Sequence, residues 1–191
     1  MLRRRSTSRI RMAVVLGSLA FSAALPAALP AMAADSGPFT AEATPGSAIK
    51  SSASVTVTLH LAGGARDLLR KMPDRPSEGP TARLTLNGFK APSGASVRVF
   101  LNFAQAGASS GTGDPHYVGA MTSFDTPAPG SPGDDIILDA APTLRRLKGK
   151  NDRVLPGDNV TVTLVLTPGS APDDASVTLD KVTLTVEPKA K

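Results

Sequence analysis

Apolar and polar residues alternate along most of the chain after residue 50. In residues 53–61, ASVTVTLHL, every second position from Val55 to Leu61 is valine or leucine, and the positions between them are polar. Successive side chains of a β-strand point to opposite faces, so this period of two predicts a strand with one buried and one solvated face. His60 falls on the solvated face.

The same alternation recurs in six further segments, which are separated by turns rich in proline, glycine and aspartate. The seven predicted strands are 53–61, 81–89, 96–103, 116–124, 135–139, 158–168 and 175–187. Short strands at such spacing are typical of a sandwich. The sequence therefore predicts an all-β fold, an antiparallel, jelly-roll-like β-sandwich of about seven strands. Its core is expected to be aliphatic, because the chain has six phenylalanines and no tryptophan.

Two segments interrupt the strand pattern. Residues 63–80 are charged and contain prolines, and one helical turn is expected near their start. Residues 139–150, DAAPTLRRLKGK, predict one short helix, in which Asp139 can cap the start, two leucines share one side and Gly149 marks the end. We expect the basic residues of this helix to be solvated and to interact favourably with its C-terminal dipole.

The first 33 residues have the composition of an export signal. Five arginines precede an uncharged apolar run, and Ala31-Met32-Ala33 fits the small-residue cleavage rule. Two prolines shorten the apolar run to about 14 residues, below the ~20 that a spanning helix needs. We therefore expect a signal peptide at 1–33, a flexible lead-in at 34–50 and the β-sandwich domain at 51–188. The mature protein is expected to be exported, periplasmic or secreted, with no membrane attachment.

The excess of positive charge lies in the predicted signal. The whole sequence has 21 basic and 16 acidic residues, and the five charged residues of the signal are all arginines. The mature chain is therefore near neutral and offers no overall basic field for a phosphate backbone, which argues against nucleic-acid binding. The absence of cysteine excludes disulfides and thiolate metal sites.

Four of the predicted elements follow one another in an order that resembles the C-terminal β-sandwich domain of polyphenol oxidases and bacterial tyrosinases, the type 3 copper proteins. The matching segments are 97–102 (VRVFLN), 117–124 (YVGAMTSF), 138–147 (LDAAPTLRRL) and 160–168 (VTVTLVLTP). In that family two copper ions, each held by three histidines, lie in a separate helical domain. The C-terminal domain holds no copper and covers the active-site entrance. The resemblance implies a non-catalytic accessory module without a cofactor, which shields a separately encoded copper oxidase.

Metal binding by this chain is limited by the number of its ligands. It has two histidines, which cannot build a six-histidine dicopper centre. A copper carrier stays open as an alternative, with Met72 or Met121 as soft ligands beside His60 and His116. Because transition-metal sites need several converging ligands and nothing in the sequence brings the histidines together, we predict no metal site. His116, Met121 and His60 are the weak candidates.

A catalytic triad can be written from Ser109, Asp114 and His116, but no G-x-S-x-G elbow accompanies it. The surrounding loop, AGASSGTGDP, has the composition of a flexible turn. We therefore predict no catalytic residue, and we expect His116 to open a strand.

A partner surface is the remaining functional expectation. Phe100 alternates with the core row of its strand, so it lies either beneath a second layer or exposed as an anchor for a partner. We take Phe100, Tyr117 and Met121 as the candidate partner-surface residues. A sandwich that serves envelope structure or carbohydrate binding is a further alternative, although the sequence offers few aromatics for stacking on sugars.

Overall fold

A computed structural model describes most of the predicted domain. The described residues are 38–50, 53–73, 75, 79–124, 127, 130–150, 159–167 and 176–189. The chain divides into two units, Met1–Ala33 and Ala34–Lys191, and every described residue belongs to the second. The predicted signal peptide, residues 1–33, lies outside the described residues. Among the helices that are described, none has the length and apolar character needed to cross a bilayer.

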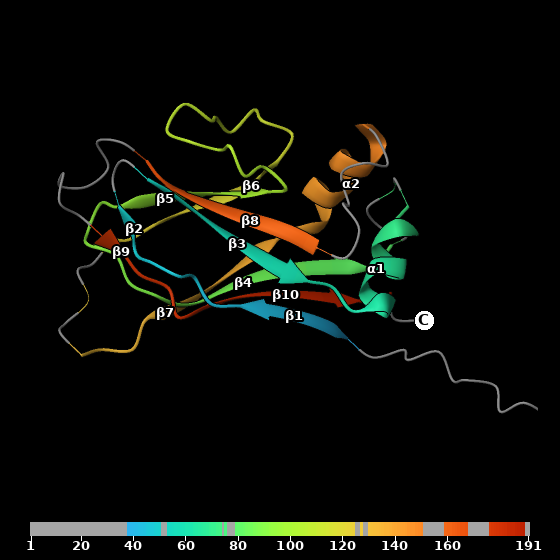
Figure 1. The fold of residues 1–191 in the computed structure, drawn as a ribbon, viewed down its shortest axis with the longest axis horizontal. Coiled ribbons are helices and arrows are strands. Elements are labelled where there is room, and N and C mark those ends of the chain that lie inside the picture. The colour runs from blue at the N-terminus through green and yellow to red at the C-terminus, as the bar shows by residue number, and fades with distance from the viewer. Residues whose placement is uncertain are drawn as a thin grey trace, which may run out of the picture. The chain divides into compact units, whose positions relative to one another are not determined.

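Two four-stranded antiparallel sheets form the sandwich that the alternation predicts (Figure 1). The first sheet contains, in spatial order, β1 (Phe39–Ala43), β10 (Lys181–Glu187), β4 (Thr81–Phe89) and β7 (Asp134–Asp139). The second contains β3 (Ser54–His60), β8 (Asn159–Leu166), β5 (Ser96–Leu101) and β6 (Tyr117–Thr122). A two-stranded ribbon of β2 (Ile49–Lys50) and β9 (Ser176–Val177) accompanies them. The prediction of an all-β antiparallel sandwich is confirmed.

The core lies between the two sheets and is aliphatic. In β3 the burial pattern alternates strictly, with the valines and the leucine buried and Thr56, Thr58 and His60 exposed. Leu84 of β4 and Leu164 of β8 are fully buried in the same core cluster. Burying one such side chain contributes roughly 1.5–3 kcal/mol, so rows of valine and leucine hold the unit together without disulfides.

The prediction of a flexible lead-in at 34–50 is wrong for part of that segment, because it contains strands β1 and β2. β1 pairs antiparallel with β10, from Phe39 opposite Val186 to Ala43 opposite Val182. Its sequence, FTAEA, has little strand signal of its own. The strand is specified by the strong Val/Thr/Leu alternation of β10, which offers it a ladder and a covered face. The described residues therefore contain ten strands, not about seven, and the last predicted strand divides into β9 and β10.

Helix α1 (Gly63–Arg70) occupies the first interruption and is longer than the single turn expected. No side chain caps its start. Its buried residues Ala65 and Leu69 lie one helical turn apart. At Gly64 the backbone comes so close to the ring of Phe39 that a Cβ atom would overlap it. Packing on the sheet therefore stabilises a helix that lacks a sequence start signal.

Helix α2 (Ala141–Lys150) confirms the second interruption as a helix. The carboxylate of Asp139 accepts a hydrogen bond from the Ala141 amide at 3.0 Å and so satisfies one amide of the first turn, although the residue whose carbonyl oxygen begins the helix is Ala140. Leu144 and Leu147 are both buried. The two helices lie at the same end of the sandwich (Figure 1). They are linked there, because Lys148 Nζ donates to the carbonyl oxygen of Met72, just after α1.

Close backbone contact at the opposite end leads to a testable prediction. A Cβ atom on Gly133, just before β7, would overlap the backbone of Gly88, which has a φ of +64° at the irregular end of β4. Backbone cannot yield as a side chain does, so Gly133→Ala is expected to lower the free energy of unfolding by about 1–3 kcal/mol. Urea denaturation measures this. Gly107→Ala is the matched control, because nothing lies within 4 Å of its Cβ position; equal losses in both variants would contradict the account.

Candidate functional site

The outer face of the β3-β8-β5-β6 sheet is partly covered by residues 102–116, which join β5 to β6 and which we call the cover loop. In Figure 1 the cover loop is the yellow-green segment above these strands. Phe100 of β5 and Val165 of β8 point away from the sandwich core, yet they are only 0% and 2% exposed. They pack with Ala106, Phe103 and Tyr117 in a second apolar cluster, here named the outer cluster. The cover loop therefore forms a third layer over one part of the sandwich.

Aromatic rings order the outer cluster. The ring of Phe100 meets Phe103 at a centroid distance of 6.1 Å and Tyr117 at 5.8 Å, both edge to face. Phe103 in turn lies 5.1 Å from the imidazole of His116. Such geometry adds roughly 0.5–1.5 kcal/mol per pair beyond the burial of area. Phe100 is thus the central contact between the sheet and the loop above it.

Arg98 fixes the far part of the cover loop to the sheet. Its guanidinium donates to the carbonyl oxygens of Ser110 and Ala108, the latter at 3.1 Å, and to the hydroxyl of Thr167 at 3.2 Å. Inside the loop, the Gly107 amide donates to the side-chain oxygen of Ser110 at 3.1 Å. A glycine- and serine-rich segment is thereby held in place by a charged side chain from the strand below it.

Helix α2 fixes the end of the loop where β6 begins. The carbonyl oxygen of Tyr117 accepts hydrogen bonds from Thr143 Oγ1 at 2.7 Å and Arg146 Nη2 at 2.6 Å. Arg146 also donates to the carbonyl oxygen of Pro115 at 3.3 Å. The loop, strand β6 and helix α2 therefore form one connected block.

His116 is engaged in this architecture and lies immediately before β6. Its carbonyl oxygen accepts from the Leu101 amide at 2.9 Å, and its Nδ1 lies 2.7 Å from the Leu101 carbonyl oxygen. A carbonyl oxygen can only accept, so Nδ1 carries a proton in this arrangement. The carboxylate of Asp114 accepts from the backbone amide of His116 at 2.8 Å. Asp114 therefore fixes the turn and does not orient the imidazole as the aspartate of a catalytic triad would.

The weak metal candidates lie apart from one another. His60 is on edge strand β3, with Nδ1 2.7 Å from Asn159 Oδ1, whereas His116 precedes the opposite edge strand β6. Three strand spacings separate those edges, or roughly 14 Å. Met72 and Met121 are buried in the core cluster. Over the described ranges, no three His, Cys, Asp or Glu residues gather closely enough to hold a metal ion.

The candidate partner-surface residues are largely covered. Phe100 lies beneath the cover loop, so of its two expected positions, covered or exposed, the covered one is found. Met121 is only 6% exposed. Tyr117 is half-buried in the outer cluster. Among the residues that the structure describes, the large hydrophobic side chains that are exposed are Phe124 at 84% and Ile137 at 65%. Alternation over the predicted strand 116–124 would place Phe124 on the same face as Val118 and Ala120, toward the core. That prediction is wrong, because β6 ends at Thr122 and the chain has left the sheet by residue 124.

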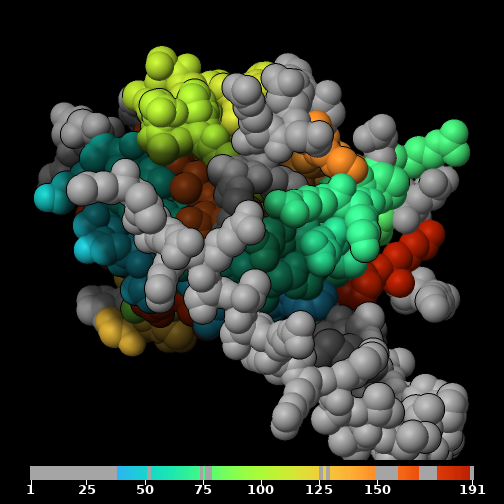
Figure 2. Space-filling view, turned by 45° about the vertical axis from the view of Figure 1, so that its right-hand side comes forward, coloured from blue at the N-terminus to red at the C-terminus, as the bar shows by residue number. Residues whose placement is uncertain are grey.

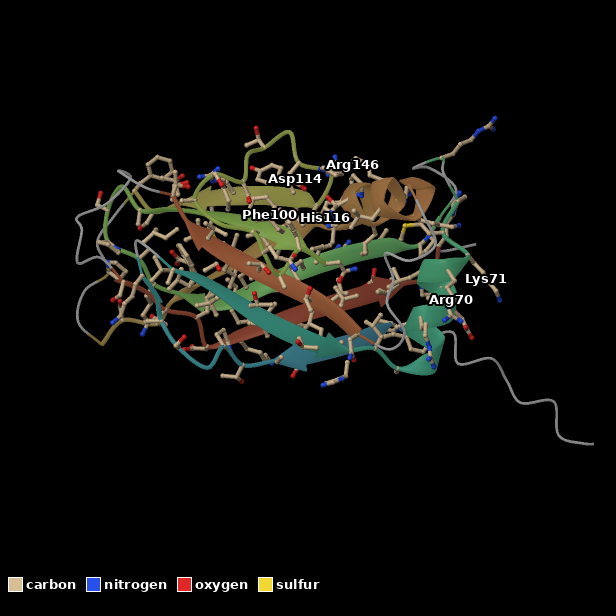
Figure 3. All side chains as sticks on the ribbon, turned by 45° about the horizontal axis from the view of Figure 1, so that its top comes forward. Arg70, Lys71, Phe100, Asp114, His116 and Arg146 are labelled. Carbon is tan, nitrogen blue, oxygen red and sulfur yellow. The ribbon has the colours of Figure 1, made fainter. Side chains whose placement is uncertain are left out.

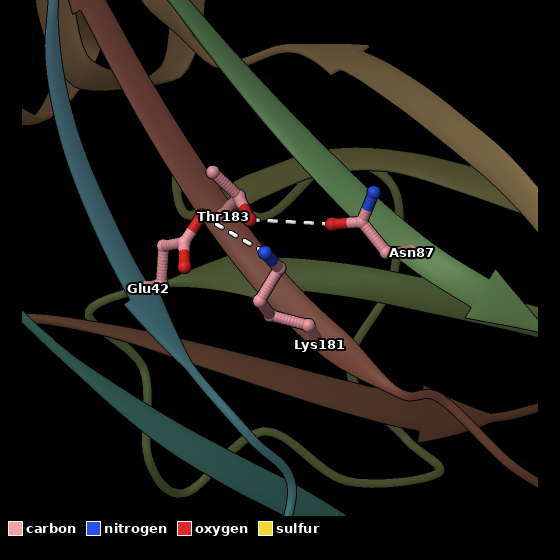
Figure 4. Close-up of polar contacts among 4 residues, drawn as sticks. All are labelled: Glu42, Asn87, Lys181 and Thr183. Atoms are coloured by element: carbon pink, nitrogen blue, oxygen red, sulfur yellow. Dashed lines mark hydrogen bonds and ion pairs between the residues drawn. The ribbon is translucent and has the colours of Figure 1, made fainter.

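The outer face of the other sheet is mostly polar, with Ile137 of β7 as an exposed apolar side chain on it. Thr183 of β10 is directed toward Asn87 of β4, with 3.2 Å between Oγ1 and Oδ1, and Lys181 forms an exposed ion pair with Glu42 of β1 at 3.0 Å (Figure 4). An exposed pair of this kind stabilises a protein by about 0–1 kcal/mol. This face therefore shows the solvated side of an antiparallel sheet, and the less usual features concentrate around the cover loop and the helices.

Comparison with known proteins finds similarity in structure. No protein-family model matches the chain, and no curated protein matches it. Among solved structures, a latent aurone synthase (polyphenol oxidase) from its natural source has a TM-score of 0.45 at 15% identity, over 75% of this chain and 26% of that one. A latent apple tyrosinase has a TM-score of 0.45 at 13% identity, over 72% and 27%. The recombinantly expressed aurone synthase has a TM-score of 0.40 at 13% identity, over 82% and 26%.

These solved structures belong to the class of protein that the order of sequence segments resembles. The chain spans about a quarter of the length of each. The similarity concerns the fold alone, and no residue of this chain receives a role from it.

Proposed function

We propose that this protein is an exported, non-catalytic accessory module that packs on, or shields, a separately encoded type 3 copper oxidase. The observation that carries the proposal is the block formed by the four segments of the sequence resemblance. β5 pairs with both β6 and β8, and α2, which directly follows β7, is hydrogen-bonded to the start of β6. The segments that resemble the polyphenol oxidase C-terminal domain thus form a connected unit.

The histidine count supports the non-catalytic part of the proposal. The whole sequence has two histidines and no cysteine, whereas the dicopper centre of the family that it resembles uses six histidines. His116 is held by the Leu101 carbonyl, and His60 lies at the other edge of the same sheet. Oxygen chemistry on copper would therefore have to come from the partner.

The test mixes the full chain with a tyrosinase that lacks its own C-terminal domain. We expect the two to co-elute in gel filtration, because a standard interface buries about 800 Å² per partner, which one face of a sandwich can supply. With the module at ten times its dissociation constant, about nine-tenths of the oxidase is occupied. If the module covers the entrance, diphenol turnover is then expected to fall by about tenfold.

Two controls accompany this experiment. An unrelated β-sandwich of similar size should leave turnover unchanged, and the chain alone, supplied with copper, should not oxidise catechol. Separate elution together with unchanged diphenol turnover would contradict the proposed function.

A further inference from the structure

Helices α1 and α2 and the end of β10 lie together at one end of the sandwich (Figures 1 and 2), and most of the described cations belong to these elements or their neighbours. We call this end the basic pole. Its described cations are Arg66, Arg70, Lys71, Arg75, Arg83, Arg145, Arg146, Lys148 and Lys189, and its described carboxylates are Asp67, Asp139 and Glu187. The other described charges are nearly balanced: Lys50, Lys90, Arg98 and Lys181 against Glu42, Asp114, Asp134, Asp135 and Asp180. Within the described residues, the excess of positive charge therefore lies at this end of the sandwich.

Part of the basic pole is structural. Arg145, Arg146 and Lys148 of α2 donate to carbonyl oxygens of Pro80, Tyr117 and Met72. These bonds attach the helix to neighbouring segments, so the three cations have a role without any partner.

Arg70 and Lys71 at the end of α1 differ from the cations of α2. Both are exposed, and Figure 3 places them at the outer end of the helix. Neither side chain has a hydrogen bond or ion pair to any part of the chain that the structure describes. Their position suits the negative end of the α1 dipole, an interaction that leaves both charged groups exposed to solvent. The dipole of α1 does not account for Arg83 on β4, which is also exposed.

We propose that the basic pole binds an acidic protein surface. Resting on the proposed function, we assign that surface to the copper oxidase, so the pole steers the module to its partner. Clustered charges of one sign raise association rates and favour partners of opposite sign. Arginine suits this role because its planar guanidinium can bind a carboxylate through two parallel hydrogen bonds.

The side chains at the pole favour protein over other polyanions. Binding to an anionic membrane normally adds insertion of apolar side chains. The large exposed hydrophobic residues of the described part are Phe124 and Ile137, which lie on or beside the edge strands β6 and β7 and not on the helices. Single-stranded nucleic acids and sugars stack on aromatic rings. Phe39 is the aromatic residue that α1 contacts, and Gly64 partly covers its ring. The ring is therefore not fully available for such stacking.

The experiment compares two double variants of the full chain. Arg70→Glu/Lys71→Glu reverses two charges at the pole, and Lys50→Glu/Lys90→Glu makes the same change in net charge away from the helices. Binding to the tyrosinase that lacks its own C-terminal domain is measured by surface plasmon resonance at low salt and at about 0.5 M NaCl. Retention on immobilised polyglutamate, heparin and phosphatidylglycerol vesicles is measured in parallel, and thermal melting of each variant checks that it is folded.

We expect the pole variant to bind the oxidase about tenfold more weakly at low salt, mainly through a slower association rate, and the control to remain near wild type. The difference should shrink at high salt, because screening shortens the range of exposed charges. Polyglutamate retention should fall in the pole variant alone.

Other outcomes separate the two proposals. If both variants bind the oxidase equally more weakly, or if the pole variant binds it as wild type does, the proposed role of the basic pole is wrong. The accessory role of the module is then unaffected. If the wild-type chain does not bind the oxidase, but its retention on polyglutamate depends on Arg70 and Lys71, the oxidase is not the partner. The result then supports an acidic protein of another kind. Pole-dependent retention on heparin or vesicles that exceeds retention on polyglutamate overturns the acidic-protein assignment.

Discussion

Replacing Phe100 with alanine is expected to lower the free energy of unfolding by about 3–5 kcal/mol, the range for a buried phenylalanine that leaves a cavity. Phe100 is 0% exposed and makes edge-to-face contacts with both Phe103 and Tyr117. The cavity would open between the sheet and the cover loop, whose glycines and serines offer little bulk to fill it. Chemical denaturation followed by circular dichroism measures the loss. Limited proteolysis should also show earlier cleavage within residues 103–113, because the loop would lose its central contact.

Phe124→Ala is the matched control for this prediction. It removes the same side chain from a position that is 84% exposed, and exposed substitutions usually change stability by less than about 0.5 kcal/mol. Similar losses in the two variants would mean that the outer cluster does not exist in solution. Unchanged proteolysis in Phe100→Ala, despite a loss of stability, would mean that Arg98 and Arg146 hold the loop without it.

The sheets could be predicted from the sequence because their inward rows are simple. Strand β3 alternates valine and leucine with threonine, and the side-chain period of a strand translates directly into one buried face. β1 could not be found this way, since FTAEA becomes a strand only against β10. Helix α1 lacked a start signal for a similar reason, because its stability comes from burial of Ala65 and Leu69.

The candidate site was harder to predict, because its parts are remote in the sequence. The two-residue alternation placed Phe100 on the outer face of its strand, but it could not show whether another segment covers that face. The cover comes from a loop whose composition indicates flexibility, and whose order depends on Arg98 and on Arg146 of α2. The basic pole likewise joins two helices that the sequence presents as unrelated interruptions. Residue patterns describe single elements well, whereas surfaces built from several elements need the fold.

The outer cluster and the basic pole use their side chains in different ways. The side chains of the outer cluster, and the arginines Arg98 and Arg146 that bind the cover loop, contact other parts of the same chain. They therefore form a rigid block and leave few groups available to bind a partner. The basic pole has exposed charged groups that the described fold does not consume, notably Arg70 and Lys71. We therefore expect substitutions in the outer cluster to act through stability, and substitutions at the pole to act mainly through binding, with a loss of stability below about 2 kcal/mol from the α1 dipole.

Asn102 directly follows β5 and gives the second large expected effect on stability. Its φ of +50° lies in the left-handed region, which alanine enters at a cost of roughly 1–2 kcal/mol. Its amide donates to the Thr161 carbonyl oxygen at 2.8 Å, and its side-chain Oδ1 accepts from the Thr161 amide at 2.9 Å. Without that acceptor the part-buried Thr161 amide would lose its partner, which costs about 1–3 kcal/mol. Asn102→Ala is therefore expected to lower the free energy of unfolding by about 2–4 kcal/mol, measured by chemical denaturation.

Two further substitutions at Asn102 separate these causes. Asn102→Gly relieves the backbone cost but still lacks the acceptor, so it should recover about half of the loss. Asn102→Asp keeps an oxygen at the acceptor position and tolerates the left-handed conformation, so it should remain closest to wild type. Because Asn102 is also where the cover loop begins, hydrogen exchange at the Thr161 amide should accelerate in the alanine and glycine variants and stay slow in the aspartate variant. Slow exchange in all three variants would show that the Thr161 amide does not depend on the side-chain oxygen of Asn102. The loss of unfolding free energy in Asn102→Ala would then come from the backbone conformation alone.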